Sequence, residues 1–355
     1  MLRLRIDAQG HARANLQAQA AMAELQRLLS LDCEDWQGCA VLARTHQNLL
    51  PLQAWCEAHG VPYCLAADKE GVLPLTAQRG FVQAVEILRE ITEPLSASEI
   101  WTYLGKTPLG PEWYDMLLVA FDQLTAELGQ CPLSAEILLD WLYDYFRELR
   151  QQPAKGLYLG TVHSAKGLEF RHVVVLDGGW STQPETLSDE RRLYYVGMTR
   201  AEQTLTLCEY LEGNPFCSQL PEEVMGRTFQ GEYLAELEKR YLQLSLKDID
   251  LDYAGRQNPT ASIHMALASL EPGDMLSFKA HEDRYLIQDA NGQVIGRTAK
   301  SFSLDLEIEE CEVAAVLVRY SDRCEESFRA FHRSQEWELI VPRIAGRVVM
   351  NDTIT

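Results

Sequence analysis

The sequence predicts an α/β protein built on a parallel sheet, with a helical insertion and a small C-terminal β domain. Apolar strand-like runs alternate with amphipathic helical segments up to residue 92, which is the pattern of βαβ units. Over 93–155 only helical segments occur, separated by prolines, and the strand pattern resumes at 157. After residue 256 the apolar runs become short and closely spaced, which indicates strands joined by tight turns.

The elements of the α/β part follow from hydrophobic periodicity and from the residues that end helices. We expect, in order, a helix over 13–30, a strand over 38–43, a helix from 49 to Gly60, a strand over 61–65 and a helix over 76–91. The inserted helices are predicted over 97–104, 111–128 and 134–149, and the later strands over 157–159, 173–176 and 205–208.

The last third of the chain has a different pattern of apolar residues. A charged helix is predicted over 232–244, and short strands over 275–278, 285–287, 294–296, 313–318 and 337–341. The turn sequence Asp289-Ala290-Asn291-Gly292 lies between two of these strands and predicts a hairpin. The expected organisation is an N-terminal helix (1–30), an α/β domain in two parts (31–92 and 156–215), a helical insertion (93–155), a helical connector (216–255) and a β domain (256–355).

Composition limits the possible functions. The chain has 355 residues and a net charge of −20, so a nucleic-acid partner requires a local cluster of basic residues. No apolar run is long enough to cross a membrane, and the N-terminus does not resemble a signal peptide, so we expect a cytoplasmic protein. The nine cysteines are scattered, form no C-x-x-C pair and have no histidine at zinc-ligand spacing, which favours reduced, buried thiols and no metal site.

The first candidate site is the segment from Gly160 to Phe170, in which polar and small residues follow a predicted strand. The carboxyl ends of strands are where α/β proteins place ligands. Gly160 and Gly167 allow close backbone approach, Lys166 adds positive charge, and Glu169 offers a carboxylate to a ribose hydroxyl. The alternative is an ordinary helix start capped by Ser164, with Lys166 in solvent.

The second candidate site covers residues 188–201. Ser188 is expected to cap a helix that buries Leu193, Val196 and Gly197, and Gly197 is expected to serve close packing because glycine weakens a helix by roughly 1 kcal/mol relative to alanine. Arginines beside this buried stripe require anionic partners. These arginines bind either an anionic ligand or, in the alternative, the neighbouring carboxylates of Asp189 and Glu190.

These two segments resemble motifs V and VI of the UvrD/Rep/PcrA family of superfamily 1 helicases. Arg44, at the end of Ala40-Val41-Leu42-Ala43-Arg44-Thr45, resembles motif IV, and Arg79-Gly80-Phe81 resembles the motif that follows it. The resemblance covers about 36–92 and 156–212, which correspond to the second RecA-like motor domain, and does not extend to the β domain.

The resemblance implies a site for ATP between two RecA-like domains. It implies that Arg44 and Arg200 contact the γ-phosphate, that Glu169 reaches the ribose, and that Lys166 and Gly167 lie at the nucleotide cleft. By the same resemblance, single-stranded DNA is contacted by Thr161, His163 and Ser164. The Mg²⁺ that accompanies ATP is held by the first motor domain, which supplies the phosphate loop.

The sequence departs from the family in two respects. It contains no G-x-x-x-x-G-K-[ST] loop, so we expect a helicase half that needs a first motor domain in cis or in trans. The helical insertion is also shorter than that of the family. The main expectation is therefore the C-terminal half of an ATP-dependent DNA helicase or translocase of DNA repair, inactive alone. The alternative is a non-enzymatic adaptor or nucleic-acid-binding module.

Three aromatic residues are further candidates for stacking on nucleic-acid bases. Trp337 and Phe278 are expected in the core of the β domain. Trp180 is the better candidate for stacking, since it follows the carboxyl end of a strand.

Overall fold

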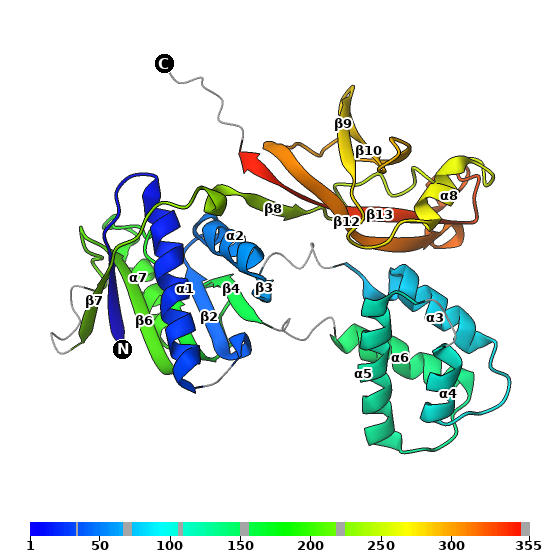
Figure 1. Cartoon of the computed structure of the whole chain (residues 1–355), viewed down its shortest axis with the longest axis horizontal. Helices are drawn as coiled ribbons and strands as arrows, with labels where there is room; N and C mark the ends of the chain where they lie inside the picture. The colour runs from blue at the N-terminus through cyan, green and yellow to red at the C-terminus, as the bar shows by residue number, and fades with distance from the viewer. Residues whose placement is uncertain (33–34, 67–72, 106–108, 150–155, 218–223, 349–355) are drawn as a thin grey trace. The chain divides into compact units, whose positions relative to one another are not determined.

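The computed structural model describes the chain except for residues 33–34, 67–72, 106–108, 150–155, 218–223 and 349–355 (Figure 1). It divides into two compact units, and the chain passes between them several times. The first unit comprises 1–68, 153–241 and 346–355, and the second comprises 69–152 and 242–345.

The first unit contains a seven-stranded sheet whose neighbouring strands all pair in parallel, as the sequence predicts. The strand order is β3-β4-β2-β5-β6-β1-β7. The strands are β1 (Leu2–Ile6), β2 (Cys39–Ala43), β3 (Tyr63–Leu65), β4 (Leu157–Thr161), β5 (Phe170–Val175), β6 (Ala201–Tyr210) and β7 (Met225–Phe229).

Helices cover both faces of this sheet. α1 (Ala12–Asp32) and α2 (Leu50–His59) pack on one face and α7 (Leu187–Met198) on the other. The side chains of strand β2 alternate between the two faces of the sheet. Val41 and Ala43 pack in the cluster of α1 and α2, whereas Leu42 packs in the cluster of α7. Alternate side chains of a strand point to opposite faces, so a strand buried on both sides is apolar throughout. The helix before Gly60 ends as predicted, with this glycine left-handed at φ 63°.

Strand β1 was not predicted from the sequence, where the N-terminal segment 1–30 was assigned only a helix over 13–30. Leu2, Leu4 and Ile6 are buried and alternate with Arg3 and Arg5. This period-two pattern is the usual signal of a strand. The strand is only five residues long and depends on parallel pairing with β6 and β7, two strands distant in the sequence.

The second unit combines helices with two small sheets. The helices are α3 (Arg79–Arg89), α4 (Ala97–Leu104), α5 (Pro111–Leu128), α6 (Ala135–Leu149) and the short α8 (Ser262–Ala268) and α9 (Glu326–Arg329). One sheet has the order β11-β10-β9 and the other β12-β13-β8. Their strands, which lie wholly or partly in the second unit, are β8 (Arg240–Gln243), β9 (Ser277–His281), β10 (Arg284–Gln288), β11 (Val294–Arg297), β12 (Leu306–Tyr320) and β13 (Glu336–Val348).

The β domain and its hairpin follow the prediction. β10 and β11 pair antiparallel on either side of the turn at 289–292, where Asp289 accepts hydrogen bonds from the backbone amides of Asn291 and Gln293. The prediction of a charged helix over 232–244 is wrong. A short 3-10 helix (Ala235–Glu238) and the strand β8 occupy that region, because Leu237 is buried in a core cluster and the next residues pair in a sheet.

Helix α3 packs within the second unit, although its sequence was assigned to the α/β domain over 31–92. Its apolar face, which includes Phe81 and Leu88, packs against Trp113 of α5 and Phe146 of α6. Buried Arg79 at the start of α3 binds Glu338 of β13 at 2.6 and 2.8 Å. The inserted helices and the β domain therefore share one compact unit.

Across the described residues, no helix is both long and apolar enough to cross a membrane.

Candidate functional site

The segment between β4 and β5 forms one side of the candidate site. These strands are parallel and β2 lies between them, so residues 162–169 must run from the carboxyl end of β4 to the amino end of β5. Such crossovers usually need a dozen or more residues and a helix. Here the segment is a series of turns in which Val162 and Ala165 are fully buried on the face that α7 covers.

Helix α7 lies directly against this segment. A Cβ at Gly197 would come within 3.1 Å of Val162 Cγ2, so the glycine allows close packing, as the sequence predicts. At the end of α7, Arg200 Nη1 donates to the carbonyl oxygen of Leu168 at 3.0 Å, and the amide of Phe170 donates to the carbonyl oxygen of Arg200 at 2.9 Å. The two segments singled out in the sequence are therefore in contact.

Arg44 joins the same face through an ion pair with Glu190 of α7. Its Nε and Nη2 donate to the two carboxylate oxygens over 2.9–3.1 Å. The Glu190 side chain is 9% exposed and that of Arg44 is 30% exposed. Hydrogen bonding to Glu190 raises the pKa of Arg44 despite the opposing effect of burial. Three of the four helicase-like segments thus meet around α7, and the fourth, Arg79-Gly80-Phe81, lies in the second unit.

Arg44 and Arg200 occupy different ends of this face. Arg44 follows the carboxyl end of β2, whereas Arg200 immediately precedes β6. Glu190, the partner of Arg44, lies eight positions before the end of α7 at Met198, about 12 Å along the helix axis, and Arg200 follows two residues later. Arg200 folds back on α7, where its Nε donates to the carbonyl oxygen of Val196 at 3.1 Å.

The residues expected to contact DNA differ in accessibility. Thr161 is buried, and its hydroxyl accepts a hydrogen bond from the amide of Ser164 at 3.2 Å. The Ser164 hydroxyl donates to the carbonyl oxygen of Thr161 at 2.8 Å. These bonds stabilise the turn. His163 and Ser164 are both exposed, and only Thr161 is buried. Ser164 caps no helix, since the chain continues as turns.

The residues expected at the nucleotide are exposed. Lys166, Gly167 and Glu169 all face solvent, and Gly167 has a φ of 87°, with open space where a Cβ would lie. Gly160 does not serve ligand approach as expected. A Cβ there would lie 2.5 Å from the ring of Tyr158 and 2.8 Å from Ser164 Oγ, so this glycine is required by internal packing.

The start of α7 differs from the prediction in two ways. The helix begins at Leu187, so Ser188 lies within its first turn instead of capping it. Arg192 pairs with Asp189 at 3.4 Å and both side chains are largely exposed, which confirms the ordinary interpretation for this arginine. Glu190 instead pairs with Arg44. Sequence reasoning missed this role because the partner lies far away in the chain.

The aromatic candidates are packed to different degrees. Trp337 is 2% exposed, as expected of a core residue, and Phe278 is partly buried against the same cluster. Trp180 is half-buried, with its ring 4.9 Å from that of Tyr194 and its Nε1 donating to the carbonyl oxygen of Leu176 at 3.0 Å. These contacts assign Trp180 a packing role.

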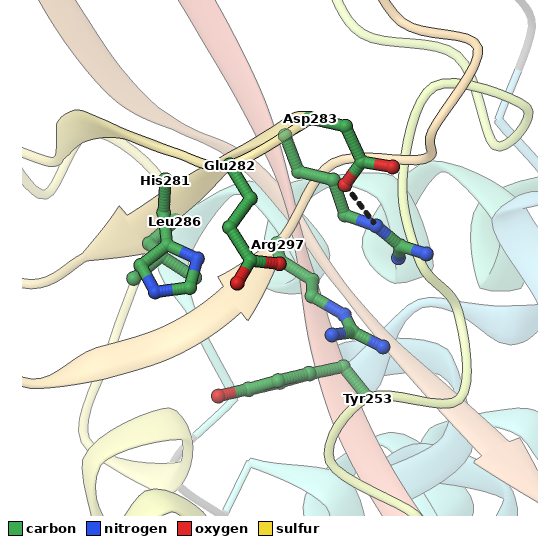
Figure 2. A pocket seen from close by; sticks show the side chains of 7 residues that line it. Tyr253, His281, Glu282, Asp283, Leu286 and Arg297 are labelled. Carbon is green, nitrogen blue, oxygen red and sulfur yellow. Dashed lines mark ion pairs between the residues drawn. The ribbon is translucent and has the colours of Figure 1, made fainter.

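A separate pocket of about 270 Å³ lies in the β domain (Figure 2). Its lining includes Tyr253, over which the guanidinium of Arg297 lies at 5.2 Å, and an ion pair between Asp283 and Arg284. No residue of the helicase-like segments lines it. Acidic and basic side chains alternate around the pocket, so its charge favours neither anionic nor cationic ligands.

Comparison with known proteins finds a family match over the segment that contains β4 and α7. Residues 156–208, which include β4, the crossover, α7 and most of β6, match the UvrD-like helicase C-terminal domain family. This stretch is therefore similar to a UvrD-like helicase C-terminal domain. This agrees with the resemblance on which the sequence interpretation rests.

Several of the curated proteins to which the chain is similar are DNA helicases. The chain is 40% identical over 87 residues to DNA helicase II of Escherichia coli, a stretch that covers 19% of this chain and 12% of that protein. It is 33% identical over 94 residues to the ATP-dependent DNA helicase Rep of Buchnera aphidicola, covering 21% and 14%. For the helicase UvrD1 of Mycobacterium tuberculosis strain H37Rv the identity is 44% over 68 residues, covering 16% and 9%. The chain thus spans about a seventh or less of these relatives.

Proposed function

We propose that this chain provides the second motor domain of an ATP-dependent DNA helicase or translocase. The observation that carries the proposal is the convergence of three helicase-like segments on α7, through Arg44 with Glu190, Val162 with Gly197, and Arg200 with Leu168. A structural role alone would not require an arginine and a carboxylate to be placed at the carboxyl edge of the sheet, where α/β proteins bind ligands.

Arg44 is the proposed cation for the γ-phosphate. In the structure its charge is neutralised by Glu190, so phosphate binding requires an exchange of one anionic partner for another. The exposed fraction of Arg44, 30%, leaves room for that exchange without unfolding the site. Arginines that neutralise charge on the transferred phosphoryl group accelerate hydrolysis by on the order of 10³–10⁵.

Arg200 and Glu169 are proposed to contact the nucleotide from the other end of α7. Arg200 donates a hydrogen bond to the carbonyl oxygen of Leu168, the neighbour of Glu169. A displacement of this backbone segment would therefore move the side chains of both Arg200 and Glu169. Glu169 is exposed and is proposed to accept a hydrogen bond from a ribose hydroxyl, while Lys166 and Gly167 approach the cleft. The phosphate loop and the carboxylates that hold Mg²⁺ would come from a first motor domain.

Single-stranded DNA is proposed to bind at the turn after β4. His163 is exposed there and can donate a hydrogen bond to a phosphate. Hydrogen bonds between Thr161 and Ser164 stabilise the turn. Because Val162 packs on Gly197, a displacement of the turn backbone would be transmitted toward α7. The net charge of −20 makes this contact depend on local geometry more than on long-range attraction.

The test combines the purified chain with a phosphate-loop motor domain of a UvrD-type helicase, single-stranded DNA and a non-hydrolysable ATP analogue. We expect background ATP hydrolysis by the chain alone and tighter association of the two domains when the analogue is present. Arg44→Ala and Arg200→Ala should each remove that tightening. Arg192→Ala is the matched control, because this arginine of α7 is largely exposed and pairs with Asp189 at the surface.

Two outcomes would contradict the proposal. Rapid ATP turnover by the chain alone that disappears in Arg200→Ala would show that no second domain is needed. Association that is indifferent to nucleotide, with the three arginine variants behaving alike, would favour the adaptor function instead. The strongly acidic composition is the observation in favour of that second candidate, because it disfavours nucleic-acid contacts outside a specific site.

A further inference from the structure

We propose that the β domain of the second unit binds a zinc-type divalent cation through Asp252, Cys324 and His332. One ligand atom from each residue, an oxygen, a sulfur and a nitrogen, lies within 4.8 Å of the other two. Thiolate, imidazole and carboxylate are the donors that Zn²⁺ takes in proteins. The cluster is remote in sequence from every residue of the proposed motor site.

His332 is the observation that points to a ligand. Its side chain is 1% exposed, and its Nδ1 lies 3.0 Å from Ser321 Oγ. Its Nε2 is buried, and no hydrogen-bond partner for it occurs among the described residues. A buried polar atom without a partner is costly, so a missing ligand is the natural explanation.

The spacing around Nε2 fits a metal better than a hydrogen bond. Nε2 lies 3.7 Å from Asp252 Oδ2, beyond normal hydrogen-bonding distance. A nitrogen and an oxygen bound at about 2.0–2.2 Å to one tetrahedral zinc would be separated by about 3.3–3.6 Å, close to the observed distance. The bond between Nδ1 and Ser321 also matches the arrangement in which the second ring nitrogen of a metal-bound histidine is held by a neighbouring oxygen.

The cluster is held by the core of the β domain. The His332 ring packs against Trp337 at 4.7 Å, and Trp337 Nε1 donates to the carbonyl oxygen of Leu251, next to Asp252. The amides of Arg333 and Ser334 both donate to the carbonyl oxygen of Gly255. These bonds connect the segment that carries His332 to the segment that carries Asp252, so the ligands are preorganised.

Arg319 competes with a metal for this position. Its Nη2 lies 3.4 Å from Asp252 Oδ1 and 3.3 Å from Cys324 Sγ, where it supplies positive charge to the two groups. The contact with Asp252 is long, and the buried Nε of Arg319 has no hydrogen-bond partner within the part of the chain that the structure describes. The side chain is 29% exposed, so the guanidinium can leave toward solvent when a cation binds.

A bound cation would tie the segment before α8 to the loop between β12 and β13. Three protein ligands leave one tetrahedral position for water or for a further ligand. The sequence analysis expected no metal site because Cys324 and His332 do not have the usual spacing and Asp252 lies far earlier in the chain. Only folding brings the three together.

The test titrates the metal-free, reduced chain with Co²⁺ and then displaces it with Zn²⁺. We expect one equivalent of Co²⁺ to produce the visible bands of a tetrahedral site and a thiolate-to-cobalt charge-transfer band, both lost when Zn²⁺ is added. Cys324→Ser should remove the charge-transfer band. Cys131→Ser is the control, because Cys131 is an exposed cysteine of the same unit.

Two further variants separate metal binding from folding. Ser321→Ala should weaken Zn²⁺ binding by about 10–100-fold, as expected when the partner of a metal-bound histidine is lost. Arg319→Gln should strengthen Zn²⁺ binding, since it removes the competing charge, and a merely damaged fold would not do so. Absence of a cobalt spectrum in the wild-type chain, or an unchanged spectrum in Cys324→Ser, would overturn the proposal.

Discussion

At the scale of single residues, the ion pair between Arg44 and Glu190 is the most informative contact of the first unit. The carboxylate is buried, and its partner is the arginine that the resemblance to helicases assigns to the γ-phosphate. Glu190 therefore positions Arg44. Measuring stability and nucleotide-dependent association in the same variants separates what this ion pair contributes to folding from what it contributes to association.

We expect Arg44→Met to destabilise the first unit by about 1–3 kcal/mol, because it leaves the buried carboxylate of Glu190 without its cation. Adding Glu190→Gln should recover part of that loss, since the uncompensated charge is then gone. Urea unfolding of the two single variants and the double variant measures the coupling. Strictly additive losses would show that the pair contributes no interaction energy.

A pH effect is expected at Glu209, whose side chain is 1% exposed and which binds Arg3 and Arg5 of β1. Burial alone would raise its pKa, but the hydrogen bonds from the two arginines hold the pKa below its ordinary value of 4.5. A depressed folded pKa contributes stability that is complete above the unfolded value and is lost as the pH falls through the folded value.

Glu209→Gln should therefore lower the unfolding free energy by about 1–3 kcal/mol at pH 7, and the difference from wild type should shrink below pH 4.5. Urea unfolding at several pH values measures it. Glu212→Gln is the control, because Glu212 is 61% exposed and pairs with Arg13 at the surface. A difference that stays constant at low pH would contradict the assignment.

At the scale of secondary-structure elements, α3 shows how packing decides which unit a helix joins. Gly80 is its second residue, and a Cβ there would lie 2.2 Å from Cγ of Trp113 in α5. The glycine permits the two helices to approach closely. A helix that resembles a motor-domain motif in sequence therefore packs on the inserted helices.

Gly80→Ala tests that packing. Alanine is the better helix former by roughly 1 kcal/mol, so a destabilising effect would have to come from the clash with Trp113. We expect a net loss of about 1–3 kcal/mol, typical of overpacking, in thermal or urea unfolding. Gly226→Ala, where a Cβ meets open space, should leave stability nearly unchanged. A stabilised Gly80→Ala variant would disprove the close contact.

At the scale of the whole molecule, each unit has its own cores. The first unit is built on the parallel sheet, with a cluster on each face, and the second on the inserted helices together with the β domain. The chain enters and leaves the second unit twice, so neither unit is a continuous segment. Separate cores allow separate unfolding transitions.

Calorimetry should therefore resolve two transitions. Glu209→Gln is expected to lower the midpoint of one and Gly80→Ala that of the other, because the two residues lie in different units. Zinc should raise only the transition that Gly80→Ala lowers, since a ligand stabilises the unit that binds it. A single transition shifted by both substitutions would show that the units unfold cooperatively.

The sequence by itself determined the local elements and the family resemblance. Helices α4 and α5 have the predicted bounds, and the strand before Arg44, the helix end at Gly60 and the hairpin at 289–292 follow from local patterns. These features depend on hydrophobic period, turn residues and caps, which neighbouring residues specify.

Tertiary structure alone decided the contacts between distant segments. The strand β1 requires partners from the other half of the unit, and the helix predicted over 232–244 gave way to sheet pairing and the burial of Leu237. The pairing of Arg44 with Glu190 and the cluster of Asp252, Cys324 and His332 likewise join residues far apart in the chain. Such contacts leave no local periodicity in the sequence, because side chains from separate segments satisfy one another only after the core has formed.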